Sequence, residues 1–186
     1  MNMAPYHTVL VHFPIALWMT ASLAILIRAF SDSALAKSID HALLPLLVIS
    51  LLSGILAFSV GLTVWPFETI SASAIGRNHL LMASWTVAFW TVILVVRWVH
   101  GEQVWIGTTR WIMAGLALIG SGVLGITGTL GGHLTGNYTD LSAALRALGW
   151  EVYTTYYLPD STLTVFVMLA LALVIIGVWG RSRARV

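Results

Sequence analysis

Four of the six histidines in this sequence lie at the ends of long apolar stretches. His7 and His12 stand at the beginning of the first stretch, His79 at the beginning of the third, and His133 just after the fourth. Successive membrane-spanning helices run antiparallel, so these four imidazoles are expected at one membrane face. Neutral imidazoles ligate metal ions and haem iron. The spacing therefore predicts a shared cofactor site, with separate hydrogen-bonded interfacial histidines as the alternative. 

Haem b is the cofactor that best unites these features. It needs two imidazoles at similar depth, an apolar slot, and polar groups for its propionates. We expect the axial pair to be His79 with His133, and otherwise His12 with His79. Arg77 is the candidate partner of a propionate, and its alternative role is an interfacial anchor. One haem is expected, or two, with His7 at the rim of the site or in a second site. Five residues separate His7 from His12, about 140° around a helix, so if both are ligands there must be two haems or a broken first turn, which Pro14 permits.

A metal ion is the second candidate cofactor. Copper or zinc could be held by three imidazoles, those of His12, His79 and His133. The chain has no cysteine, which excludes thiolate ligands, disulfides and iron–sulfur clusters. Small residues follow each histidine at helical spacing and would let a flat group approach, although such residues are also the usual packing device between membrane helices.

The composition fixes the kind of element that must position these histidines. Of 186 residues, 59% are hydrophobic and 9% charged, whereas soluble domains carry roughly a quarter charged residues. The net charge of +2 is too small for a nucleic-acid binder. We therefore predict an all-α integral membrane protein, not a soluble enzyme. Five stretches are long enough to span a bilayer: Val9–Phe30, Leu43–Trp65, Leu80–Val99, Ile112–Leu130 and Leu163–Gly180.

The basic residues predict the orientation of these spans. Seven of the nine Lys and Arg residues fall on one side of the membrane, and only Arg77 and Arg146 on the other. Basic residues concentrate on the cytoplasmic side. We expect the N-terminus outside and the C-terminus in the cytoplasm, in a bacterial inner membrane. The four histidines then face the periplasm, while His41 and His100 lie on the cytoplasmic side.

The chain is interpreted as a single membrane domain, residues 1–186. Residues 7–135 form a four-helix core, and residues 136–186 add an interfacial segment and the fifth span. In that segment a short helix is expected to begin near Asp140 and end at Gly149. It either lies along the membrane surface or covers the top of the bundle.

Three motifs carry a family resemblance. The segment His7-Thr-Val-Leu-Val-His12-Phe-Pro-Ile-Ala-Leu resembles the opening of a bacterial membrane family, domain of unknown function 2231, with Thr8 in place of a proline. Arg77-Asn-His79 is similar to its third-helix motif and Gly131-Gly-His133-Leu to its terminal motif; the usual continuation is replaced here by Thr135-Gly-Asn-Tyr-Thr. The resemblance covers residues 7–135. It implies a four-helix membrane core with outer-side histidines, similar to modules beside or fused to cytochromes, and supplies no activity.

Two functions of different classes follow. The first is a b-type cytochrome-like electron-transfer protein, an oxidoreductase subunit with quinone, a periplasmic cytochrome or other redox subunits as candidate partners. The second is a non-redox module that binds copper or zinc or serves transport or assembly. Against transport, we expect no acidic or basic residue in the helix interiors. No nucleophile–base pair stands out, so no catalytic residue is predicted.

Overall fold

The computed structural model describes residues 3–150, 164–165, 168, 172 and 175, and four of its helical segments are long and apolar enough to cross a membrane. This confirms the prediction of an all-α membrane protein. The expected fifth span, Leu163–Gly180, falls largely outside the described residues. The four segments are α1–α2 (Ala4–Leu10 and His12–Phe30), α3 (Ala34–Gly61), α5 with the 3₁₀ turn η1 (Ala74–His100 and Gly101–Trp105), and α6 (Thr109–Leu134).

Local sequence explains where these helices begin and break. The Oγ atom of Ser33 accepts the backbone N–H of Ala36 at the start of α3, at 3.2 Å, and Ser73 caps α5 in the same way. Pro14 has no N–H to donate to the carbonyl of Leu10, and the chain leaves regular helix at Val11, between α1 and α2. The backbone of Val11 nonetheless keeps helical dihedral angles, φ −62° and ψ −24°, so α1 and α2 continue as one segment, Ala4–Phe30.

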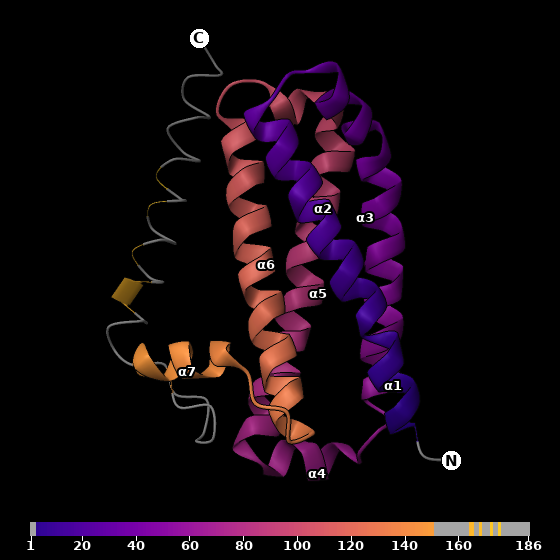
Figure 1. Ribbon diagram of the computed structural model, residues 1–186, viewed down its shortest axis with the longest axis vertical. Coiled ribbons are helices and arrows are strands. Elements are labelled where there is room, and N and C mark those ends of the chain that lie inside the picture. The colour runs from indigo at the N-terminus through magenta and orange to yellow at the C-terminus, as the bar shows by residue number, and fades with distance from the viewer. Residues whose placement is uncertain (1–2, 151–163, 166–167, 169–171, 173–174, 176–186) are drawn as a thin grey trace.

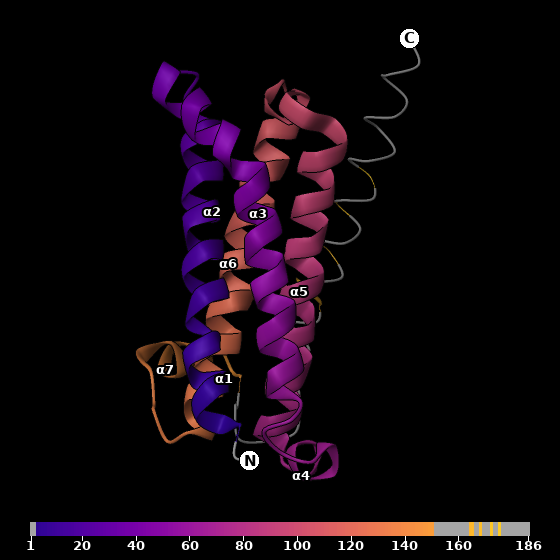
Figure 2. The same ribbon diagram turned by 90° about the vertical axis from the view of Figure 1, so that its right-hand side faces the viewer.

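The four segments form an up-and-down bundle (Figures 1 and 2), in which α2 packs against α3 and α6, and α5 packs against α3 and α6. Its centre is apolar and aromatic: the rings of Trp18 and Trp90 stack with centroids 5.6 Å apart. Near this level α2 and α6 are joined by a 2.6 Å hydrogen bond between Ser22 and Ser121. Beyond it α1 packs against α3, so α1 and α6 diverge.

The two ends of the bundle differ in their polar groups. At the end that holds the start of α3 and the end of α5, Arg97 binds Asp40 through two hydrogen bonds of 3.1 and 3.2 Å, and both side chains are buried. Nearby, Arg28 and Arg110 both bind Asp32. We call this the ion-pair end. The opposite end, which holds α1 and the end of α6, is called the histidine end.

Two short helices lie at the histidine end. Helix α4 (Phe67–Ala72) connects α3 to α5, and α7 (Asp140–Ala147) lies across the outside of α6 (Figure 1). The residue range of α7 confirms the short helix expected from Asp140, and Gly149, with φ of 85°, follows its end. Leu145 and Trp150 pack with Leu130 of α6, so the buried face of α7 covers the bundle.

Candidate functional site

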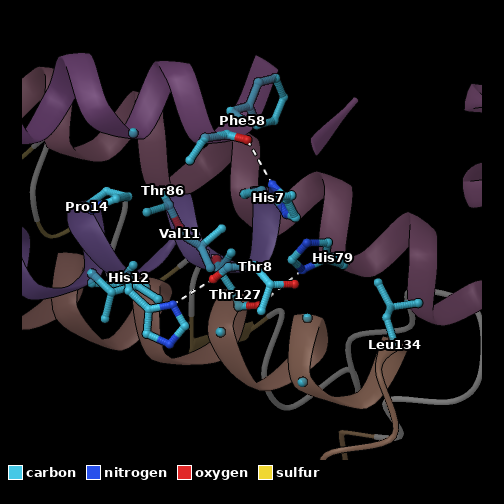
Figure 3. Close-up of a pocket in the computed structure, with 18 of the residues that line it drawn as sticks. His7, Thr8, Val11, His12, Pro14, Phe58, His79, Thr86, Thr127 and Leu134 are labelled. Atoms are coloured by element: carbon cyan, nitrogen blue, oxygen red, sulfur yellow. Dashed lines mark hydrogen bonds between the residues drawn. The ribbon is translucent and has the colours of Figure 1, made fainter. Parts of the chain in front are cut away.

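A cavity of about 360 Å³ lies inside the histidine end of the bundle. All four long segments contribute to its wall, which is mainly apolar, and Trp18 of the central stack is among the residues that line it. Three of the four histidines predicted to share a site line this cavity: His7, His12 and His79. Figure 3 shows how they lie around it.

The imidazole of His7 is held between α1 and α3. Its Nδ1 lies 3.1 Å from the carbonyl oxygen of Ala57, which can only accept, so Nδ1 carries the proton and donates (Figure 3). A methyl group at Gly61 would come within 2.8 Å of Cε1 of His7. The absence of a side chain at Gly61 therefore allows the ring to lie directly against α3.

His79 on α5 repeats this arrangement against α6. Its Nδ1 donates to the carbonyl oxygen of Thr127 at 3.1 Å (Figure 3). A Cβ at Gly131 would lie 3.0 Å from Cε1 of His79. In both histidines the neutral ring has its proton on Nδ1, which leaves the Nε2 lone pair as the nitrogen that could bind a metal.

His12 is held differently. Its Nδ1 donates to the carbonyl oxygen of Thr8, one turn earlier along its own chain segment, at 2.7 Å. The ring lines the cavity, yet the residue is exposed on the surface of the bundle. His12 therefore stands at the edge of the cavity and not in its interior wall.

His133 and Arg77 lie outside this cavity wall. His133 is buried and packs edge-on against Tyr138, with ring centroids 4.9 Å apart. Gly131 faces His79, and two residues along a helix turn by about 200°, so His133 points away from that histidine. The pair His79–His133, expected from their common depth, thus does not border the cavity. His7, expected at the rim, takes the place of His133.

The guanidinium of Arg77 donates to the carbonyl oxygen of Ser71 in the connection from α4, at 3.1 Å. Polar groups at the aqueous edge of the cavity come instead from the end of α6 and the turn after it, where Thr135 and Asn137 line the wall and bind each other at 3.1 Å. The sequence signal for these two was weak, because threonine and asparagine are common in turns.

The described residues contain no group of three His, Asp or Glu side chains close enough to hold a metal ion. His12, His79 and His133 therefore do not form the three-ligand copper or zinc site that the sequence suggested. Two hydroxyls also line the wall: those of Thr86 and Thr127 lie 2.7 Å apart and join α5 to α6 beside the cavity.

Comparison with known proteins identifies the family. Residues 3–140 match the model of the family described as predicted membrane protein (DUF2231), so this chain belongs to that family. The match includes all four long segments and every residue of the cavity wall named above. No curated protein matches the chain. No solved structure matches it.

Proposed function

We propose that this DUF2231 membrane protein is a b-type cytochrome-like electron carrier in which His7 and His79 hold haem b. One observation carries the proposal. Two imidazoles from different helices border one apolar cavity, and each donates its Nδ1–H to a carbonyl of a neighbouring helix. Ligating histidines are typically oriented by such second hydrogen bonds.

The hydrogen bonds explain what the two histidines do. A carbonyl partner fixes the tautomer with the lone pair on Nε2 and raises the basicity of that nitrogen. The carbonyls of Ala57 and Thr127 also restrict rotation of the rings, since each belongs to the backbone of a helix. Haem iron with two imidazole ligands supplies one-electron transfer and has no open position for oxygen chemistry.

The cavity fits a planar apolar cofactor in three respects. Its volume of about 360 Å³ falls in the range of about 300–1,000 Å³ usual for small-molecule and cofactor sites. Gly61 and Gly131 give the two imidazoles room against the helices behind them. At the aqueous edge, the amide of Asn137 offers its second N–H to a propionate, in place of Arg77, while the hydroxyl of Thr135 already donates to the carbonyl of Gly132 at 2.9 Å.

The proposal includes an orientation. The distribution of Lys and Arg favours a bacterial inner membrane location with the N-terminus and the histidine end outside. The site would then exchange electrons with a membrane quinone, a periplasmic cytochrome or another redox subunit. The metal-binding alternative is less favoured, because the described residues offer no set of three ligands.

An absorption spectrum of the detergent-purified protein, before and after dithionite, tests the proposal. We expect a low-spin spectrum with a reduced α-band that is lost or converted to high spin in His7→Ala and in His79→Ala. His133→Ala, and His41→Ala at the ion-pair end, are the matched controls and should keep it. A colourless protein purified from haem-sufficient cells would overturn the proposal, and its metal content would then be measured.

A further inference from the structure

His12 lies at a depth in the membrane where a polar side chain is energetically unfavourable. It is 16 residues before Arg28, which stands at the ion-pair end, so it lies about 24 Å along the helix from that level. The hydrocarbon layer is about 30 Å thick. His12 therefore lies inside the apolar layer, and its residue is exposed on the bundle surface. An ionisable side chain in such a place is costly and marks a functional site by default.

The hydrogen bond of His12 defines what it can recognise. Since the carbonyl of Thr8 accepts from Nδ1 at 2.7 Å, the neutral ring carries its proton there. Nε2 is left as a hydrogen-bond acceptor. A molecule that binds this nitrogen must bring an O–H or N–H donor.

The cavity opens beside His12 toward the membrane. The exposed residues of the cavity wall that belong to the long helices are Thr8, His12 and Gly128, of α1–α2 and α6, and Thr8 lies one turn further out than His12. The other exposed wall residues belong to the connections that follow α3 and α6, namely Trp65, Thr135 and Asn137. Segments α1–α2 and α6 are those that diverge, since α1 packs against α3. Figure 3 shows His12 at this side of the cavity. We call this opening the lateral mouth.

We propose that the lateral mouth binds a quinol, a lipid-soluble ring that donates one of its O–H groups to Nε2 of His12. A ligand at this depth arrives through lipid, so it must be uncharged and apolar over most of its surface. It must also carry a donor for an imidazole in the apolar layer. A quinol ring with an isoprenoid tail meets both demands, whereas an acyl chain has no donor.

The proposed binding of the quinol is inferred from the geometry of the lateral mouth alone. The redox role of the quinol rests on the proposed function. Oxidation of one quinol to the quinone would release two protons and two electrons. The one haem held by His7 and His79 would take these electrons one at a time, passing the first to a ferric periplasmic cytochrome before it takes the second. The binding site is distinct from the haem ligands, because His12 stands at the edge of the cavity while His7 and His79 are held in its wall.

The test measures binding of decylubiquinol and of its dimethyl ether to the protein in phosphatidylcholine nanodiscs under argon, with empty nanodiscs subtracted. The ether keeps the ring and tail but cannot donate. We expect saturable binding of one quinol per chain and about tenfold weaker binding of the ether, as for the loss of one hydrogen bond. His12→Phe should weaken quinol binding by the same factor and abolish the difference between quinol and ether. His12→Gln, which retains an acceptor, should restore it.

His41→Phe, the same change at the ion-pair end, is the control and should bind like the unmodified protein. Equal binding of quinol and ether to the unmodified protein, or an absence of saturable binding, would overturn the inference. The measurement does not need haem. A colourless protein whose quinol binding depends on His12 would refute the cytochrome proposal alone, whereas a low-spin haem protein that binds no quinol would refute the lateral mouth alone.

Discussion

The two ends of the bundle accommodate polar groups among apolar helices in opposite ways. At the ion-pair end the charged groups of Asp40 and Arg97 satisfy each other, and the guanidinium of Arg28 also stacks over Trp105 at 5.5 Å. At the histidine end the imidazoles of His7 and His79 each donate one N–H to a backbone carbonyl and keep the other nitrogen beside a cavity. One end is closed by its own side chains, and the other has capacity for a ligand.

Glycines show the same contrast on a smaller scale. Gly61 and Gly131 lie directly against the rings of His7 and His79, so their lack of a side chain is what lets these rings approach. A Cβ at Gly122, in the middle of α6, would meet no atom of the described residues within 4 Å. The small-residue pattern of α6 is thus a mixture of positions that are needed for close contact and positions that face open space.

The largest effect is expected from breaking the ion pair. Arg97→Met leaves the carboxylate of Asp40 buried without its partner, which typically costs about 3–5 kcal/mol. The free energy of unfolding, measured by titration with SDS in mixed micelles, should fall by about that amount. Asp40→Leu should have a comparable effect.

The double variant Asp40→Leu/Arg97→Met tests whether an unpaired buried charge causes the loss of stability in the single variants. Replacing both charges with apolar groups removes the cost of an unpaired buried charge, so the double variant should be more stable than either single one. If the two single costs simply add, the ion pair is not what closes this end, and the contrast between the ends is wrong.

Overpacking of the histidine end should have the next largest effect on the free energy of unfolding. Gly61→Ala places a methyl group 2.8 Å from Cε1 of His7, and displacement of the ring should cost about 1–3 kcal/mol in the same unfolding assay. Under the proposed function, the variant should also shift the absorption spectrum toward high spin. Gly131→Ala should act in the same direction through His79.

Gly122→Ala is the matched control for these two variants. Because this glycine lies inside a helix with open space around it, alanine should stabilise the protein by about 0.5–1 kcal/mol and leave the spectrum unchanged. Equal effects of alanine at Gly61 and Gly122 would mean that the rings are free to move and that the glycines do not position them.

The sequence was sufficient to predict the four spans that fall on the described residues and the end at which the histidines gather, because apolar runs and antiparallel order determine depth. It was not sufficient to predict which histidines share the cavity. The depth of a residue in the membrane does not determine how its helix is rotated about its own axis. The rotation of α6 brings Gly131 to His79 and turns His133 toward Tyr138.

The buried ion pair was also missed. No acidic or basic residue was expected in the helix interiors, yet Asp40 and Arg97 are both buried between α3 and α5. Their opposite charges at the same end of two helices were the available signal. Whether two such residues face each other depends again on helix rotation, which hydropathy alone does not determine.

A smaller effect on the free energy of unfolding is expected in the middle of the bundle, between the two ends. The hydroxyls of Ser22 and Ser121 bind each other at 2.6 Å where α2 still touches α6, before α1 diverges. A double-mutant cycle with Ser22→Ala and Ser121→Ala should give a coupling of about 0.6 kcal/mol, the average for such bonds between membrane helices. A coupling near zero would show that the opening between α1 and α6 does not begin at this bond.

The smallest effect is expected at Asp32, on the surface of the ion-pair end. The Arg28 guanidinium, and then that of Arg110, lower the pKa of the Asp32 carboxyl below its ordinary value. A carboxyl whose pKa is lower in the folded than in the unfolded protein stabilises the fold above the unfolded value of about 3.9, and this contribution is lost as the pH falls through the folded value. Asp32→Asn should therefore lower the midpoint of SDS unfolding slightly at pH 7, and the difference should shrink as the pH falls below about 3.9. Because Asp32 is exposed, salt should reduce the difference.

Glu68→Gln on α4 is the control at the histidine end. A difference for Asp32→Asn that persists unchanged at pH 3 would mean that the aspartate acts through packing or hydrogen bonding independent of its charge.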